Sequence, residues 1–528
     1  MCRIAGIAFA LAATHVLANT PAPVLRWGYG GCTSYCQTGR YSSPAVVDID
    51  GDGQAEVIGG GGDVVVLNGA TGALRYRDAS SVRVWPDIAV GDLNHDGKLA
   101  LVVGRRDGTV SAFNGDLSLR SGWPQTLFAG NEVRALALAD LDGNGKLHVV
   151  AGGAWAISTG QVDVLAPNGS ERAGWPRPQS GDPGYAAGIF NDDIAVGDLR
   201  RDGHVEIFVP TDTHYILGLN PDGNYIPANI LFGVGKVWPE VGVWVDQAFD
   251  LIGYGDCVTP GIGLRPNFAA SAPALGDVNG DGRLEMAVVG NVYDCSVGNT
   301  PPPGGGDRYH LPWLFNEDRS RFAASGYDWS TEPAPSAGAA PLAEYDYALI
   351  QDAQPNTVLA DLDGDGKLEI LYSSYDGKVH AYWLDKTEHG NWPFAIPGTG
   401  IHFAAPPVAA ELYHDGKAEV LVATWPQATT TETGKLYILD DLGNILTSAD
   451  LPAPNGDTWN GTLASPTLAL LPGSRNLAVV LMTRASGLVA FDLPGTEYAR
   501  TLWPTGRGGY LRDGRAFNDR IFADGFRG

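Results

Sequence analysis

A short acidic loop between two apolar segments occurs seven times in this chain, and this repetition limits the possible folds more than any other feature. Three copies, which begin at Asp48, Asp277 and Asp361, are complete: acidic or amide side chains stand at positions 1, 3 and 5, and glutamate at position 9. Carboxylates this close together repel one another unless a cation lies among them. Alternating oxygen ligands around a glycine turn are typical of a loop that wraps a hard cation such as Ca²⁺.

The spacing of the loops predicts four-stranded units. The seven loops begin at Asp48, Asp92, Asp140, Asp198, Asp277, Asp361 and Glu411. In the first unit, short segments at 45–47, 56–58, 63–67 and 73–76 predict four strands, with the acidic loop between the first two. Four-stranded units that repeat about every 40 to 50 residues are typical of β-propeller blades, whereas solenoids use shorter repeats.

We therefore predict an all-β fold, a β-propeller of eight four-stranded blades. The eighth unit, from residue 465, keeps the apolar frame without the acids. If this unit only closes the ring, seven blades is the alternative. We expect residues 25–29 to help close the ring beside residues 501–503.

With these loops and this spacing, the chain resembles the FG-GAP/VCBS repeat family of calcium-loop propellers, which includes the integrin α-subunit head and many secreted bacterial proteins. The resemblance spans roughly residues 40–510 and fits the bacterial branch better, because the integrin-type signatures are mostly missing. It implies that Ca²⁺ binds the side chains at loop positions 1, 3, 5 and 9 and the backbone carbonyl at position 7. In the complete loops these residues are Asp48, Asp50, Asp52, Gln54 and Glu56; Asp277, Asn279, Asp281, Arg283 and Glu285; and Asp361, Asp363, Asp365, Lys367 and Glu369.

Four loops depart from the full pattern. Two lack the ninth carboxylate, and we expect them to bind Ca²⁺ more weakly, which makes up to five sites in all. Their residues are Asp92, Asn94, Asp96 and Lys98, and Asp140, Asp142, Asn144 and Lys146. In the fourth loop, Arg200 at position 3 can pair with Asp202 and Glu206 in place of a metal. The seventh loop has Tyr413 at position 3 and is not counted among the sites.

An EF-hand shares the start of this pattern but requires a carboxylate at position 12. That position is Gly59, Val288 and Tyr372 in the three complete loops, so an EF-hand is excluded. The 71 glycines and 35 prolines suit a turn-rich β protein. The formal net charge of −25 argues against nucleic acid or an anionic membrane as a partner.

The N-terminus has the pattern of a secretory signal. Arg3 precedes an apolar run at 4–13, and small residues precede a cleavage point before Asn19. We therefore predict a signal peptide at 1–18, the propeller at 19–510 and a C-terminal tail at 511–528. The expected location is extracellular, at the cell surface or in the periplasm, with no membrane span.

Four cysteines remain after the signal peptide, and an even number in an exported chain favours disulfides. Strand parity places Cys257, between the fourth and fifth blades, and Cys295, between the second and third strands of the fifth blade, on the same face. We predict the bonds Cys257–Cys295 and, from proximity in sequence, Cys32–Cys36.

The sequence contains no nucleophile elbow, zinc-protease motif or phosphate-binding loop in a suitable context. We therefore expect a secreted calcium-binding protein that acts as a binding or adhesion module, with structural Ca²⁺. The alternatives are a polysaccharide-active enzyme similar to propeller-type rhamnogalacturonan lyases, and an architectural surface protein.

Long insertions indicate where a partner would bind. They lie at about 228–270, 294–308 and 327–356, and strand parity places them on the face opposite the acidic loops. Their aromatic residues suit a glycan or protein ligand. These residues are Trp238, Trp244, Tyr254, Tyr309, Trp313, Tyr327, Trp329, Tyr345 and Tyr347.

Overall fold

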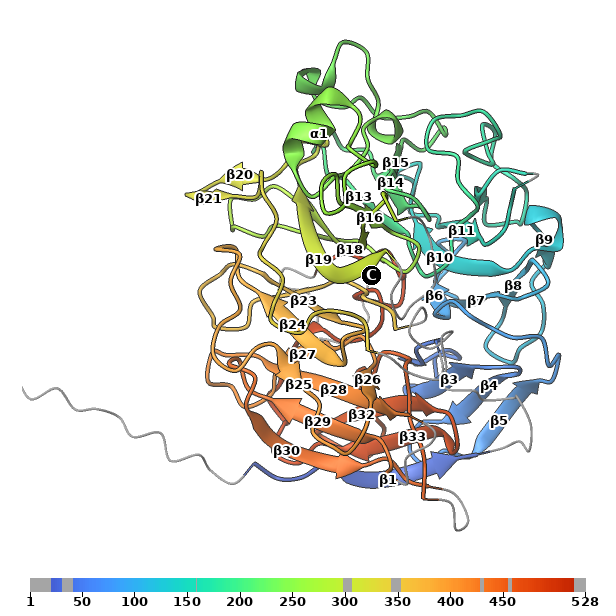
Figure 1. Cartoon of the computed structure of the whole chain (residues 1–528). Helices are drawn as coiled ribbons and strands as arrows, with labels where there is room; N and C mark the ends of the chain where they lie inside the picture. Colours follow the sequence, from blue (N-terminus) through green and yellow to red (C-terminus); the bar gives the residue numbers. More distant parts are fainter. Residues whose placement is uncertain are drawn as a thin grey trace, which may run out of the picture.

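The computed structural model describes residues 20–30, 41–157, 159–297, 306–342, 353–427, 432–453 and 458–516. Within these ranges, eight antiparallel sheets form a ring (Figure 1), so the fold is the eight-bladed β-propeller that the sequence predicts. The predicted signal peptide, Cys32 and Cys36 lie outside the described residues.

Each blade follows the predicted strand order. The first strands are β2 (Ala45–Val47), β6 (Ala89–Gly91), β10 (Val133–Ala139), β13 (Ala195–Gly197), β17 (Ala274–Gly276), β22 (Val358–Ala360), β27 (Val408–Glu411) and β31 (Thr467–Leu470). The second strands are β3 (Glu56–Gly60), β7 (Ala100–Gly104), β11 (His148–Gly153), β14 (Glu206–Pro210), β18 (Glu285–Tyr293), β23 (Glu369–Ser373), β28 (Glu419–Pro426) and β32 (Leu477–Thr483). The third strands are β4 (Val64–Asn68), β8 (Thr109–Phe113), β12 (Val162–Leu165), β15 (Ile216–Leu219), β19 (Asp307–Phe315), β24 (Lys378–Tyr382), β29 (Lys435–Leu439) and β33 (Gly487–Asp492).

The outer edges of the blades are less regular. Regular fourth strands are β5 (Leu74–Asp78), β9 (Gln125–Thr126), β25 (Phe394–Ala395), β30 (Ile445–Asp450) and, in the eighth blade, β1 (Val24–Tyr29). Single bridges such as Val162 to Arg177 mark the outer edge elsewhere. Two short strands, β16 (Arg265–Asn267) and β26 (His402–Ala404), extend β18 and β28. The strands β20 (Ala323–Ala324) and β21 (Tyr327–Asp328) form a separate hairpin.

The hydrophobic core lies between neighbouring blades. Val47 and Ile58 of the first blade, for example, share one buried cluster with Val90 and Leu101 of the second. Because a blade buries both faces of its sheet, its inner strands are continuous apolar runs rather than alternating ones. First strands of neighbouring blades contact one another and therefore surround the central axis.

The N-terminal strand closes the ring. β1 pairs with β33, and Trp27 stands opposite Ala490, so the first residues of the propeller complete its last blade. This pairing provides partners for the backbone N–H and C=O groups along the outer edge of β33. Residues 25–29 do not lie beside residues 501–503 as expected, because the latter belong to β34 (Arg500–Trp503), which pairs with the first strand of the seventh blade.

Tryptophans on the outer parts of five blades contact the next blade. In each case the indole N–H donates to a backbone carbonyl in the turn between the third and fourth strands of that neighbour. The pairs are Trp27 with Gly69 (3.0 Å), Trp123 with Pro167 (3.2 Å), Trp175 with Pro221 (3.0 Å), Trp329 with Leu384 (3.0 Å) and Trp392 with Asp441 (3.0 Å).

After β34 the chain runs through the centre of the ring. Residues 504–516 pass the inner strands of the blades, which donate backbone N–H groups to them at 2.7–2.8 Å. The donor and acceptor pairs are Leu468 with Pro504, Val90 with Tyr510, Leu138 with Leu511, Val196 with Asp513 and Leu275 with Gly514. The side chain of Arg512 is fully buried and donates to the carbonyl oxygens of Ile88 and Gly506 at 3.0 and 2.7 Å.

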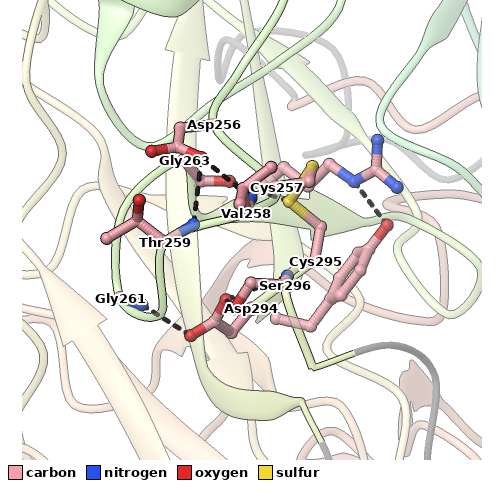
Figure 2. Close-up of a disulfide and its surroundings, with 11 residues drawn as sticks. Asp256, Cys257, Val258, Thr259, Gly261, Gly263, Asp294, Cys295 and Ser296 are labelled. Carbon is pink, nitrogen blue, oxygen red and sulfur yellow. Dashed lines mark hydrogen bonds between the residues drawn. A yellow bond between two sulfur atoms is a disulfide. The ribbon is translucent and has the colours of Figure 1, made fainter.

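The largest insertion contains two 3₁₀ turns, η2 (Ile230–Phe232) and η3 (Trp238–Glu240), and the helix α1 (Gln247–Ile252), at the top of Figure 1. A third 3₁₀ turn, η1 (Phe128–Gly130), precedes the third blade. The predicted Cys257–Cys295 disulfide is present, with Cα atoms 5.0 Å apart, and it ties this insertion to the fifth blade (Figure 2). Asp294 supports the same corner by accepting from the backbone N–H of Gly261 at 2.7 Å.

Candidate functional site

The acidic loops share one face of the propeller. All seven join a first strand to a second strand, for example β2 to β3 and β22 to β23. Because strand direction reverses at every turn within a blade, these loops lie on the side opposite the insertions. No helix of the described residues is both long and apolar enough to cross a bilayer.

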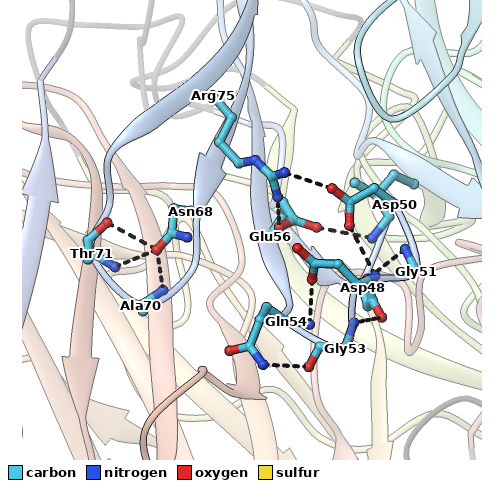
Figure 3. Close-up of polar contacts among 12 residues, drawn as sticks. Asp48, Asp50, Gly51, Gly53, Gln54, Glu56, Asn68, Ala70, Thr71 and Arg75 are labelled. Atoms are coloured by element: carbon cyan, nitrogen blue, oxygen red, sulfur yellow. Dashed lines mark hydrogen bonds and ion pairs between the residues drawn. The ribbon is translucent and has the colours of Figure 1, made fainter.

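The side chain at position 1 organises each complete loop. In the first loop, Asp48 accepts backbone N–H groups from Asp52 at 3.0 Å and Gly53 at 2.8 Å (Figure 3). The glycine at position 6 has a φ between 78° and 86° in all seven loops. Only glycine adopts this left-handed conformation without strain, which explains the residue at that position.

The glutamate at position 9 is buried at the start of the second strand. One carboxylate oxygen accepts the backbone N–H of position 2. The bonds are Ile49 to Glu56 (3.2 Å), Leu199 to Glu206 (3.0 Å), Val278 to Glu285 (3.1 Å), Leu362 to Glu369 (2.7 Å) and Leu412 to Glu419 (2.7 Å). This bond fixes the carboxylate beside the other loop ligands.

Crowding of the carboxylates is visible in their pKa values. Burial, with a smaller contribution from the loop aspartates, raises the pKa of Glu369 to about 9 and that of Glu285 to about 8. A cation among these groups would favour their ionised forms and reverse the shift. Oxygen donors alone, arranged around a glycine turn, fit a hard cation such as Ca²⁺.

Three loops bring three carboxylates together, with ligand atoms within 4.8 Å of one another. These sets are Asp48, Asp50 and Glu56; Asp198, Asp202 and Glu206; and Asp361, Asp363 and Asp365. The fourth loop was expected to be an ion-paired turn, and Arg200 does lie 3.5 Å from Asp202 and 4.0 Å from Glu206.

Three arginines outside the predicted site residues form contacts with the first three loops. Arg75 pairs with Asp50 at 2.7 Å and also with Glu56 (Figure 3). Arg172 pairs with Asp142 of the third loop at 2.7 Å, and Arg120 donates to the position-7 carbonyl of the second loop. A guanidinium therefore reaches oxygen atoms that would otherwise bind a metal.

The fifth and sixth loops have different neighbours. Asn279 donates to Asp281 at 3.1 Å, and the indole of Trp383 donates to Asp363 at 3.0 Å. Lys367 pairs with Asp365 at the exposed edge of the sixth loop. Among the described residues, no arginine forms an ion pair with the acidic side chains of these two loops.

The insertion surface differs from the expected aromatic surface. Trp238, Trp244, Trp313 and Trp329 are buried, so they pack the insertions onto the blades. Tyr309 and Tyr327 are half-buried, and Tyr345 and Tyr347 lie outside the described residues. Of the aromatic residues named for this face, Tyr254 is exposed. The largest insertion also exposes aliphatic side chains, beside charged and polar ones: Ile230, Leu231, Val234, Leu251, Ile252, Val258 and Ile262.

The blades and acidic loops define a repeat propeller, and comparison with known family models finds one match within it. The FG-GAP-like repeat model matches residues 361–422, which include the sixth and seventh loops. This match supports the predicted resemblance to the FG-GAP repeat family. No curated protein matches it at a significant level.

Several solved structures have a similar fold. The exotype rhamnogalacturonan lyase YesX has a TM-score of 0.51 at 16% identity, over 94% of this chain and 80% of that one. Rhamnogalacturonan lyase YesW gives 0.48 at 16% identity, over 94% and 80%. Bacillus licheniformis rhamnogalacturonan lyase PL11 gives 0.46 at 16% identity, over 89% and 74%. At this level of identity the likeness shows the fold alone.

Proposed function

We propose that this protein is an extracellular, calcium-stabilised propeller that acts as a binding or adhesion module. The observation that supports it best is the geometry of the fifth and sixth loops. In each, a buried position-9 glutamate faces the aspartates of its own loop, and the ion pairs of the described residues bring no guanidinium into the set.

Calcium would bind these two loops most strongly. In the first loop Arg75 already neutralises Asp50 and Glu56, so Ca²⁺ would have to displace it. The same competition applies to the third loop through Arg172. At about millimolar Ca²⁺ and a Kd of about 10⁻⁴ to 10⁻³ M, each site contributes roughly 0.4 to 1.4 kcal/mol of stability.

An oxidising location fits the Cys257–Cys295 bond, because disulfides persist in extracellular compartments. The N-terminal signal pattern supports the same location. Millimolar Ca²⁺ is a normal condition for extracellular modules, so weak loops suffice there.

The ligand we propose is a protein surface, docked on the largest insertion. The turn η2 contacts α1, which brings their exposed side chains near one another. Val234 is 92% exposed and Val258 is 87% exposed. Exposed aliphatic side chains suit a protein partner, whereas glycans are usually held on exposed aromatic rings together with polar groups.

The metal part is tested by calorimetry with and without EDTA. We expect chelation to lower the melting temperature and Ca²⁺ to restore it. The double variant Asp361→Ala, Asp363→Ala should lose one of the titratable sites, whereas Asp198→Ala, Asp202→Ala should change calcium binding little. An unchanged melting temperature in EDTA would exclude structural calcium.

The binding part is tested by adhesion to immobilised extracellular matrix proteins and to immobilised polysaccharides. Val234→Asp, Val258→Asp should reduce protein adhesion at least tenfold. Leu470→Asp is the matched control, because Leu470 is 57% exposed on the face of the acidic loops. Adhesion to polysaccharide that the double variant leaves intact would contradict a protein ligand.

A further inference from the structure

A cleft between the second and third blades contains a guanidinium with an unused hydrogen-bond donor. The cleft has a volume of about 360 Å³ and lies on the face of the acidic loops. Its lining residues are Asn94, Asn114, Leu119, Arg120, Ser121 and Pro167, with Asn168 at the edge of the third blade. The NH2 group of Arg120 donates to the carbonyl of Lys98 at 3.3 Å, but its buried NH1 group has no hydrogen-bond partner among the described residues.

The third blade shows how an arginine at the equivalent position forms hydrogen bonds and ion pairs. Glu171 pairs with Leu165 in the third blade and directly precedes Arg172. Leu119 pairs with Phe113 in the second blade and directly precedes Arg120. The two arginines therefore occupy equivalent positions. Arg172 bonds Asp142 at 2.7 Å and the carbonyl of Pro221 at 2.9 Å, and it pairs with Asp222 at 3.5 Å.

Around Arg120 the corresponding acids have been replaced by neutral residues. By loop position and strand register, the acids Asp142, Glu171 and Asp222 of one cleft correspond to Asn94, Leu119 and Asn168 of the other. The position-9 residue changes as well, from His148 to Ala100. A buried donor without a partner is costly, and a charged one more so. Although the chain has a net charge of −25, the residues at these positions around Arg120 are neutral, whereas those around Arg172 are acidic.

The other groups in the cleft can bind hydroxyls. Asn168 uses its side-chain carbonyl to accept from Ser170, which leaves its N–H₂ group for a ligand. Asn114 donates its N–H₂ group to Ser118 at 3.0 Å, which leaves its carbonyl oxygen as an acceptor. Leu119 and Pro167 add apolar surface for the C–H groups of a ring.

We propose that this cleft binds a sugar acid of one ring, whose carboxylate pairs with Arg120. A guanidinium recognises a carboxylate through charge-assisted hydrogen bonds, and a cavity of this size lies at the lower end of the usual range for small ligands. The site lies on the face opposite the insertion surface and does not depend on the function proposed above. Asn94 and the carbonyl of Lys98 belong to both this cleft and the second acidic loop, so the sugar acid and Ca²⁺ would compete for binding there.

Calorimetric titration in EDTA tests the proposal, because EDTA removes any binding through calcium. The probes are galacturonate, galactose and inorganic phosphate. We expect galacturonate to bind at least tenfold more tightly than either other probe. Arg120→Gln should weaken galacturonate binding at least tenfold, while Arg172→Gln, the matched control, should leave it unchanged.

A second variant covers the case in which Arg120→Gln does not fold. Asn94→Asp, Asn168→Asp supplies the acids found around Arg172, so Arg120 gains internal partners, and galacturonate binding should be lost in a stable protein. Galacturonate binding that survives either change would overturn the proposal. Equal affinity for galactose would exclude the carboxylate contact, and equal affinity for phosphate would exclude the sugar.

Discussion

At the scale of single residues, buried ionisable side chains couple the stability of this fold to pH. In the sixth loop, one oxygen of the position-9 glutamate, Glu369, accepts the backbone N–H of Leu362, and the carboxylate lies near the aspartates of its own loop. In the sixth loop the pKa of Glu369 is raised to about 9, chiefly by burial. Its carboxyl group is therefore protonated near neutral pH until a cation replaces the proton.

Calcium affinity at the sixth loop should consequently rise with pH. Binding Ca²⁺ requires the ionised form of Glu369, so the proton must leave, and affinity should increase about tenfold per pH unit below pH 9 if one proton is released. Glu369→Gln should bind more weakly and lose this dependence. Titration calorimetry in buffers with different ionisation enthalpies measures the released proton; an affinity that is constant from pH 6 to pH 8 would contradict the assignment.

A second buried group, His380, makes the stability of the fold fall as pH rises. Its ring nitrogens contact Glu388 at 3.0 Å and Asp376 at 3.3 Å, and its ring stacks beside those of Tyr372 and Tyr382. Burial lowers the pKa of His380, but its bonds to the two carboxylates outweigh burial and raise the pKa to about 9. A raised histidine pKa stabilises the fold below the unfolded value of about 6.5, and that stability is lost as pH rises through 9.

We expect the wild-type protein to lose on the order of 3 kcal/mol between pH 6.5 and pH 9.5, relative to His380→Gln. Urea unfolding at a series of pH values measures this difference, and groups common to both proteins cancel. His389→Gln serves as the control, because His389 lies on the surface beside Asp385, and it should keep the wild-type dependence. Parallel curves for the wild type and His380→Gln would show that the buried charge is absent.

At the scale of elements, the outer strands join each blade to the next. The sequence shows Trp-Pro pairs after the second, third and sixth units, but their role depends on neighbours about 45 to 50 positions away in the chain. β1 supplies the same contact for the eighth blade through Trp27, whose indole donates to Gly69 of the first blade. The contact that joins the eighth blade to the first is therefore the same indole-to-carbonyl hydrogen bond that joins other neighbouring blades.

Substitution of Trp27 should measure the strength of ring closure. Trp27→Ala removes a buried indole and should destabilise the protein by about 3–5 kcal/mol. Trp27→Phe keeps apolar contact but loses the N–H donor, and should cost about 1–3 kcal/mol, because the buried carbonyl is left unpaired. Leu25→Ala, a change at a half-exposed position of the same strand, should have little effect in the same chemical denaturation experiment. Equal losses for Trp27→Ala and Leu25→Ala would mean that β1 contributes little to closure.

At the scale of the whole molecule, the repeated patterns predicted the fold and the long-range contacts did not follow from them. Loop spacing and apolar strands gave eight blades, because each signal lies within one unit. Arg200 was predicted from the sequence, but Arg75 was missed, because it lies 25 positions beyond Asp50, at the bulge in β5. The central position of residues 504–516 could not be predicted, because nothing local in that segment specifies contact with distant blades.

That central segment should be required for folding. A chain that ends at Trp503 leaves the inner-strand N–H groups of Leu468, Val90, Leu138, Val196 and Leu275 without their acceptors. At about 1–3 kcal/mol for each buried unpaired group, the loss is roughly 5–15 kcal/mol, which equals the stability of a typical domain. We expect the truncated chain to have no cooperative unfolding transition in calorimetry.

A point substitution separates this effect from simple loss of chain length. Arg512 is fully buried, lies 3.5 Å from Asp87 and donates to the carbonyls of Ile88 and Ser43 in two neighbouring blades. Arg512→Ala leaves the buried Asp87 carboxylate without this guanidinium, so it should cost about 3–5 kcal/mol. Arg515→Ala removes a side chain that is 45% exposed and pairs only locally with Asp513, so its unfolding midpoint should stay close to that of the wild type. If both variants unfold at the wild-type midpoint, the C-terminal segment occupies the centre of the ring without stabilising it.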